Sequence, residues 1–180
     1  MTRDEYLLLD DDALIAQCDF HAYRASGPGG QRRNKVSTAV RLTHRPTGIE
    51  AHAEEARYQA DNRRHAVARL RMHIACSLRQ PIEPGDVSVP ATVKECLFVA
   101  RGGQAAGTAR LDVGRRDKRF WLVAAFLLDL LEAADARASD AAARIDISTA
   151  NFTRLLCEDK SLLSVANDIR RRHNLKPLTP

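Results

Sequence analysis

The sequence predicts an α+β fold in which a small β-sheet and a long helix are followed by an α-helical C-terminal region. Alternating and β-branched stretches flank a turn before residue 54, which is the pattern of a hairpin. Helical spacing then continues to residue 78, and capped helical stretches dominate the sequence after residue 112. We therefore expect a domain over residues 1–80, a linker over 81–111 and a helical region over 112–180.

The first domain is predicted element by element. Residues 4–16 have helical character, and Asp11 or Asp12 is expected to cap a second short helix there. Cys18–Arg24 is expected to be extended, and part of Val36–Thr43 is expected to be a strand. Arg45–Gly48 is then a turn, Ile49–Ala53 the second arm of a hairpin, and Glu54–Leu78 a long helix. One small apolar face of the long helix comprises Ala56, Ala60, Ala66, Val67, Leu70 and Ile74.

Beyond this domain, prolines and a glycine mark residues 80–92 as a linker. Val93–Ala100 is expected to be a strand or a short helix, and Arg101–Gly107 a loop. The remaining stretches predict four helices. They are Phe120–Ala134, a helix that Ser139 caps and that ends at Ile145, a helix that Ser148 caps and that ends at about Cys157, and Leu162–Asn174.

The positive charge of the chain is concentrated in one segment. The net charge is +5, but residues 21–80 carry twelve Lys or Arg against four acids, a net +8. Residues 1–20 carry one Arg against six acids. Such a single-sign field attracts polyanions, so nucleic acid is the expected partner class.

Four scattered cysteines, Cys18, Cys76, Cys96 and Cys157, do not form a paired metal-ligand motif. We expect no metal and no cofactor, and we read the cysteines as small buried residues of a reducing compartment. No apolar run is long enough to span a bilayer, and the acidic N-terminus does not resemble a targeting segment. The expected location is the cytoplasm, without a membrane partner.

Residues 24–35 form the most informative stretch, Arg-Ala-Ser-Gly-Pro-Gly-Gly-Gln-Arg-Arg-Asn-Lys. Its glycines and its proline exclude a regular helix or strand, because glycine adopts positive φ freely and proline lacks an N–H donor. We expect a loop, carried by the sheet and the long helix, that presents Gln31 on a backbone able to enter a narrow space. The cations behind Gln31 suit a phosphate-lined environment.

Gln31 does not titrate, so its amide is not an ordinary general base. It is suited to orienting a water molecule or holding a leaving hydroxyl, with its backbone N–H as a further donor. A glutamine at the tip of a basic loop is therefore interpreted as part of an active site that a partner completes.

The Arg24–Gln31 string, with Asn34-Lys35, Ala39–His44 and Pro46–Ile49, resembles the catalytic domain of peptide chain release factors over roughly residues 15–80. The family's core motif, Gly-Gly-Gln or GGQ, stands here as Gly29, Gly30 and Gln31. The resemblance implies that the loop enters the peptidyl transferase centre of the large ribosomal subunit. There the glutamine helps water to attack the ester of peptidyl-tRNA.

The resemblance also implies roles for particular residues. Gly29, Gly30 and Gln31 are the expected catalytic residues, and Gln31 is a site for N5-methylation by a glutamine methyltransferase. The residues expected to face ribosomal RNA are Arg24, Arg32, Arg33, Asn34, Lys35 and Arg41. His44 lies in the matched string but is interpreted as a structural strand residue.

The chain departs from the family in two respects. It offers no room for codon-reading domains in 180 residues, so it resembles the short, codon-independent ribosome-rescue hydrolases. Those end in a Lys/Arg-rich tail, whereas the dense basic cluster near this C-terminus is Arg170-Arg171-Arg172, on a predicted helix. Arg32 and Arg33 also replace the histidine and valine of the common family string.

Alternative interpretations remain open. The protein is either a hydrolase, an RNA- or ribosome-binding module that keeps the loop without productive hydrolysis, or a nucleic-acid-binding protein that uses a helix-turn-helix over Ser139–Cys157. That second helix offers Thr149, Asn151, Thr153 and Arg154, although ordinary helix packing is the favoured interpretation. A second tripeptide, Gly102-Gly103-Gln104, lacks the flanking string and is interpreted as chance.

Overall fold

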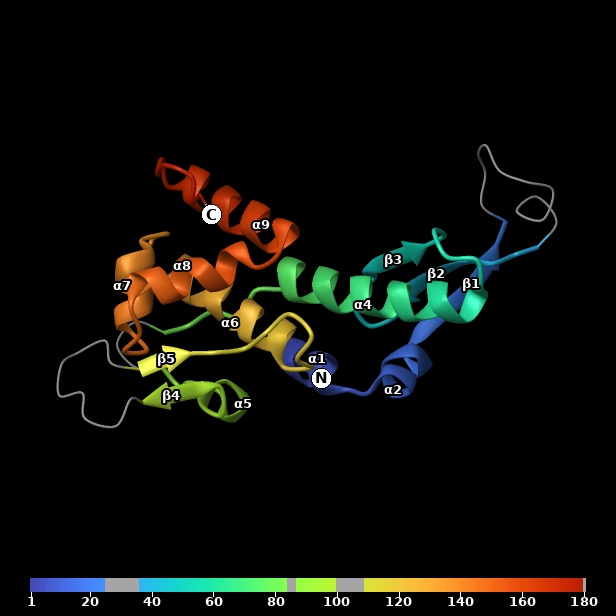
Figure 1. Cartoon of the computed structure of the whole chain (residues 1–180), viewed down its shortest axis with the longest axis horizontal. Coiled ribbons are helices and arrows are strands. Elements are labelled where there is room, and N and C mark those ends of the chain that lie inside the picture. The colour runs from blue at the N-terminus through green and yellow to red at the C-terminus, as the bar shows by residue number, and fades with distance from the viewer. Residues whose placement is uncertain (25–35, 84–86, 100–108, 180) are drawn as a thin grey trace. The chain divides into compact units, whose positions relative to one another are not determined.

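The chain is seen here in a computed structural model that describes residues 1–24, 36–83, 87–99 and 109–179 (Figure 1). These residues form two compact units, Met1–Ile74 (unit 1) and Ala75–Pro180 (unit 2). The predicted α+β class is confirmed: a small antiparallel sheet and a long helix are followed by a helical C-terminal region.

Two short helices open unit 1. Helix α1 (Arg3–Leu8) starts with a capping box in which the side chains of Thr2 and Glu5 each bond to the other residue's backbone N–H. Helix α2 (Asp11–Ala16) is capped by Asp10, which accepts a 2.7 Å hydrogen bond from the Ala13 N–H. The prediction that Asp11 or Asp12 is the cap was therefore wrong. Both lie in the first turn, where carboxylates face the positive end of the helix dipole.

The sheet of unit 1 has three antiparallel strands in the order β1-β2-β3. They are β1 (Cys18–Tyr23), β2 (Ala39–His44) and β3 (Glu50–Ala53). The predicted turn between β2 and β3 is present, and Gly48 has a φ of +69° there, which only glycine adopts without strain. Its N–H donates to the His44 carbonyl at 2.8 Å and closes the turn.

Helix α4 (Gln59–Ser77) runs alongside this sheet (Figure 1). It begins five residues later than the predicted Glu54, because the side chain of Asn62 binds both the N–H and the carbonyl of Ala56 and holds that residue outside the helix. The buried side chains of α4 in unit 1 come from one face: Asn62, Ala66, Val67, Leu70 and Ile74.

Polar side chains of α4 also bond to the outer strand β3. Arg69 donates to the His52 carbonyl at 2.6 Å, and the Nδ1–H of His73 donates to the Glu50 carbonyl at 2.7 Å. Free carbonyls on an edge strand invite pairing with another chain. These two bonds therefore satisfy part of that edge and fix α4 along the sheet.

The described part of unit 2 contains a small hairpin and four helices around a central apolar helix. The central helix α6 (Phe120–Ala133) buries both of its sides, with fully enclosed Phe120, Leu127 and Leu130. The other elements are α5 (Ala91–Lys94), β4 (Leu97–Val99), β5 (Ala109–Leu111), α7 (Ala138–Ala143), α8 (Thr149–Cys157) and α9 (Lys160–Arg172). The interval 81–111, predicted as a linker, contains α5, β4 and β5.

Helix caps in unit 2 agree with the sequence at one position and differ at another. Ser148 caps α8 as predicted, accepting from the Asn151 N–H at 3.1 Å. Ser139 does not cap α7: that helix begins at Ala138 after Arg137, and the Ser139 hydroxyl donates to Asp140 instead. Asp159 caps α9 by accepting from the N–H groups of Ser161 and Leu162.

Candidate functional site

Residues 24–38 connect β1 to β2, so the predicted catalytic loop belongs to a hairpin of the sheet. Gly29, Gly30, Gln31, Arg32, Arg33, Asn34 and Lys35 all lie outside the described residues, and so does Gly102-Gly103-Gln104. Both flanks are described. Tyr23 at the end of β1 stands opposite Ala39 at the start of β2, in register with the rest of the antiparallel pair. Opposite residues of such a pair lie about 5 Å apart, so the two ends of the connection are fixed close together.

The returning flank is held by the first turn of α4. Gln59 donates from Nε2 to the Ser37 carbonyl at 3.0 Å, and Asn62 donates from Nδ2 to the Thr38 carbonyl at 2.8 Å. Asn62 is fully buried. Its remaining Nδ2 hydrogen and its Oδ1 bind the carbonyl and the N–H of Ala56, at 3.0 and 2.9 Å. One amide therefore joins the start of β2 to the entry of α4.

The departing flank is held by Tyr23. Its hydroxyl donates to the Glu54 carboxylate at 3.3 Å. Its ring stacks on that of His21, with centroids 6.2 Å apart, and the Arg41 guanidinium lies over it at 5.5 Å. Burial raises the pKa of the Tyr23 hydroxyl, and the nearby Glu54 carboxylate adds to the increase. The hydroxyl therefore stays protonated and keeps its role as a donor.

Two of the residues expected to face RNA are described, and both are exposed. Arg24 directly follows β1, and Arg41 lies on β2 between His21 of β1 and His52 of β3 in the strand register. The sequence did not point to Asn62, Gln59, Tyr23 or Glu54 as residues that hold the flanks. An asparagine among the basic residues that open the long helix was the available signal, but its partners cannot be inferred from spacing.

His44 is a buried structural residue, in agreement with the interpretation from the sequence. Its Nδ1 lies 2.7 Å from the Thr47 hydroxyl, and its Nε2 lies 3.2 Å from the Gln17 side-chain oxygen. The Tyr6 ring packs edge-on against it, with centroids 4.6 Å apart. Burial lowers the pKa of His44, and the neighbouring Arg45 adds to the decrease. The lowered pKa favours the neutral imidazole at neutral pH in the folded protein.

This depressed pKa predicts a pH dependence of stability. Because His44 takes up a proton more readily in the unfolded chain, the folded state loses stability as the pH falls through the ordinary value of 6.5. Above that value the contribution is complete. We expect the urea concentration at the unfolding midpoint to decrease as the pH is lowered from about 8 to about 5. We expect His44→Gln to make this decrease smaller. An unchanged slope in the variant would contradict the assignment.

The C-terminal basic cluster is engaged within unit 2. Arg170 donates to the carbonyls of Lys176 and Ala136, at 2.7 and 2.6 Å. Arg171 pairs with Asp168 at 2.8 Å, and Arg172 pairs with Glu132 at 2.9 Å. These arginines stabilise α9 and the residues after it, so they do not offer a cluster of free cations.

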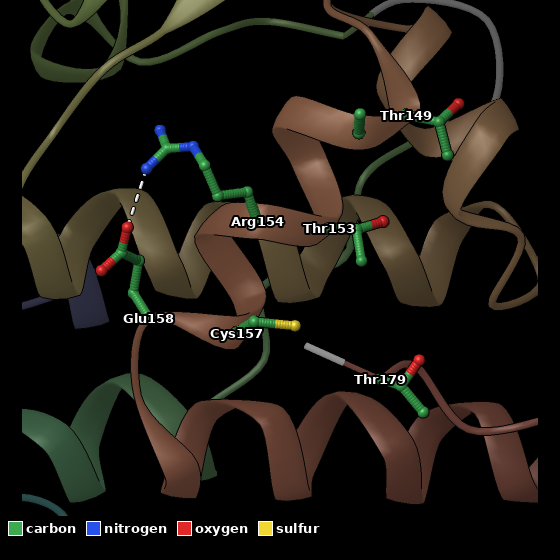
Figure 2. Close-up of a pocket in the computed structure, with 7 residues that line it drawn as sticks. Thr149, Thr153, Arg154, Cys157, Glu158 and Thr179 are labelled. Carbon is green, nitrogen blue, oxygen red and sulfur yellow. Dashed lines mark hydrogen bonds and ion pairs between the residues drawn. The ribbon is translucent and has the colours of Figure 1, made fainter.

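An open hollow of about 630 Å³ lies beside α8. Figure 2 shows Thr149, Thr153 and Cys157 along this helix, with Thr179 opposite them and Arg154 paired to Glu158. The ion pair is 2.7 Å long, and Asp112 lies 3.8 Å from the same guanidinium. The carboxylates offset the charge that a DNA-reading helix needs for phosphates.

Asn151, the remaining polar residue of the predicted recognition helix, is also engaged. Its amide accepts from the Leu111 N–H at 2.8 Å and donates to the Leu111 carbonyl at 3.0 Å. It therefore extends the edge of β5 in the manner of a paired strand residue. This geometry supports ordinary packing of α8.

Within the described ranges, no group of three or more His, Cys, Asp or Glu side chains is arranged to hold a metal ion. Burial raises the pKa of all four cysteine thiols, for Cys76 to about 11. The thiols are therefore protonated near neutral pH and poor nucleophiles. None of the described helices has the length and apolar character needed to cross a membrane.

The region around the β1–β2 connection is similar to a known protein family. Residues 14–86 match the RF-1 domain family. Similar proteins include peptide chain release factor 1 of Streptococcus agalactiae, 49% identical over 63 residues, which are 34% of this chain and 18% of that protein. Those of Geobacter metallireducens and Geobacter sulfurreducens are 48% and 42% identical over 58 and 72 residues, or 32% and 40% of this chain.

The chain thus spans about a fifth of the length of the release factors it matches, 16% to 20% in these three cases. The match includes the sheet of unit 1, the flanks held by Tyr23 and Asn62, and Gly29-Gly30-Gln31. Through residues 14–86, the chain shares the RF-1 domain with peptide chain release factors.

Proposed function

We propose that the protein hydrolyses the ester of peptidyl-tRNA in the peptidyl transferase centre of the large ribosomal subunit. The observation that carries this proposal is the position of Gly29-Gly30-Gln31, inside the RF-1 match and on a connection whose two flanks are tied to the sheet and α4. Anchored flanks allow a glycine-rich connection to be presented to a partner without loss of register in the strands that carry it.

The chemistry follows from the properties of the three residues. Water attacks the ester carbonyl carbon, the bond to the tRNA 3′ oxygen breaks, and the peptide leaves as a carboxylic acid while that oxygen takes a proton. Gly29 and Gly30 supply the backbone freedom to place Gln31 at the reacting ester. The Gln31 N–H stabilises the developing negative charge, and the side chain controls the position of the water.

The proposed partners are peptidyl-tRNA and the RNA of the large subunit. Arg24, Arg32, Arg33, Asn34, Lys35 and Arg41 contact this RNA. Gln31 is also the site at which a glutamine methyltransferase modifies the side-chain amide. A mass shift of one methyl group on the peptide containing Gln31, absent in Gln31→Ala protein from the same cells, is the expected signature.

We further propose that hydrolysis does not depend on a stop codon and serves ribosomes that have stalled. The likeness that supports this proposal lies in residues 14–86, the RF-1 domain that contains Gly29-Gly30-Gln31. Release driven by this domain alone would leave the codon unread.

Codon dependence is measured with three ribosome complexes that carry the same labelled peptidyl-tRNA. One presents a stop codon, one a sense codon, and one a truncated messenger that leaves the decoding site empty. We expect release from the truncated complex to be at least as fast as release from the stop-codon complex. Release that requires the stop codon would overturn the rescue proposal while leaving the hydrolase assignment intact.

A further inference from the structure

The arginines of unit 1 fall into two groups. Those in the first group lie within ion-pair distance of a carboxylate: Arg3, Arg45, Arg63, Arg64, Arg69 and Arg71. The other arginines in the described part of this unit are Arg24, Arg41 and Arg57, and that part offers none of them a carboxylate partner. The ion pairs within unit 1 offset the charge of the first group. Among the described arginines of this unit, the guanidinium charge that is not offset by an ion pair therefore belongs to these three.

The three arginines belong to the same end of the sheet. Arg24 follows β1 where residues 24–38 begin, and Arg41 reaches the ring of Tyr23, the last residue of β1. Arg57 lies next to Ala56, whose backbone is joined through Asn62 to Thr38, where the connection returns. Three arginines without a carboxylate partner among the described residues therefore lie near the two flanks of the connection.

Two of these arginines lie over tyrosine rings. The Arg41 guanidinium is 5.5 Å from the Tyr23 centroid, and that of Arg57 is 5.7 Å from the Tyr58 centroid. The Tyr58 side chain is 55% exposed although it is large and partly apolar. A guanidinium on a ring is held in place while its N–H edge stays free for a phosphate, and an exposed ring offers a face to an unstacked base.

Glu54 and Glu55, the acids that precede Arg57 in the sequence, bond to other side chains. Glu54 accepts from the Tyr23 hydroxyl, and Glu55 pairs with Arg69 at 2.7 Å and with His65 at 3.0 Å. We infer that Arg57–Tyr58 joins Arg41–Tyr23 in one ribosomal RNA contact, in which both guanidinium groups bind phosphates and Tyr58 stacks on an unpaired base. This inference rests on the proposed function, because it takes the RNA of the large subunit as the partner.

The test compares two double variants with the same loss of charge. Arg41→Gln/Arg57→Gln removes the two proposed phosphate contacts, whereas Arg63→Gln/Arg64→Gln removes two arginines that pair with Asp12 and Asp61. Binding of each protein to purified large ribosomal subunits is measured by fluorescence anisotropy between about 50 and about 200 mM salt. Thermal unfolding of each variant checks that the fold is retained.

We expect the first variant to bind at least about tenfold more weakly at low salt, and its slope of log affinity against log salt to be smaller by about 1.5. The matched variant keeps the wild-type slope. Equal changes in both variants would show that net charge alone matters, and no change in the first would show that these arginines do not touch the subunit. Either result overturns the inference.

A competition experiment identifies the partner as RNA. Deproteinised large-subunit RNA should displace wild-type protein from the subunits, and Tyr58→Ala should weaken this RNA binding several-fold more than Tyr58→Phe. Failure of the RNA to compete would mean that a ribosomal protein occupies the surface, which contradicts the inference. Because binding is measured without hydrolysis, a protein that binds RNA as expected but releases no peptide overturns the proposed function alone.

Discussion

Replacing Gln31 with alanine should lower the rate of peptide release by at least about 10²-fold. The variant keeps the backbone N–H that stabilises charge on the ester, but loses the amide that positions the attacking water. Misplacement of a reacting group by about 1 Å is enough for a loss of this size. Release is measured as labelled peptide freed from stalled complexes in a single turnover.

Gln104→Ala is the matched control, because it makes the same substitution in the second Gly-Gly-Gln of the chain. That tripeptide lies beyond residues 14–86, which match the RF-1 domain. Wild-type release by Gln104→Ala is expected. If Gln104→Ala abolished release and Gln31→Ala did not, the assignment of the site would be wrong.

Replacing Asn62 with alanine should destabilise unit 1 by about 2–4 kcal/mol. The substitution leaves the Thr38 carbonyl and both polar backbone groups of Ala56 without their partner. Each buried group that loses its hydrogen bond costs about 1–3 kcal/mol, and partial access of water reduces the sum. Urea denaturation of wild type and variant measures the difference in the free energy of unfolding.

Because Asn62 positions the flank of the connection, we expect its loss to affect peptide release as well as stability. Leu70→Ala, at a buried position of the same helix, should cost a similar 2–5 kcal/mol, roughly, without touching either flank. At a temperature where both variants are folded, Asn62→Ala should release peptide several-fold more slowly than Leu70→Ala. Equal release rates would limit Asn62 to a role in folding.

The hairpin and its turn were predictable from the sequence, because their signals are local. The alternation of β2 and β3 and the φ requirement of Gly48 both act within a few residues. The start of α4 was not predictable in this way. Helical spacing extends back to Glu54. The side chain of Asn62, six residues after Ala56, binds the backbone N–H and carbonyl of Ala56, so the helix starts after that residue.

The sequence also could not show which arginines form ion pairs with a carboxylate and which do not. Arg63 and Arg71 pair with Asp12 and Asp11, partners 51 and 60 positions away, and only the fold brings them together. The same holds for Arg172, which lies 40 positions from Glu132. The basic stretch in the sequence therefore predicted a polyanionic partner, and the ion pairs of the fold determine which of the described cations remain unpaired.

Single-turnover peptide release by the wild-type protein tests directly whether the protein hydrolyses peptidyl-tRNA. Stalled ribosomes with labelled peptidyl-tRNA and an empty decoding site are mixed with wild-type or Gln31→Ala protein, and free peptide is followed over time. We expect release by the wild type and a rate lower by at least about 10²-fold for the variant. Absence of release by the wild-type protein, on intact ribosomes and on separated large subunits alike, would contradict it.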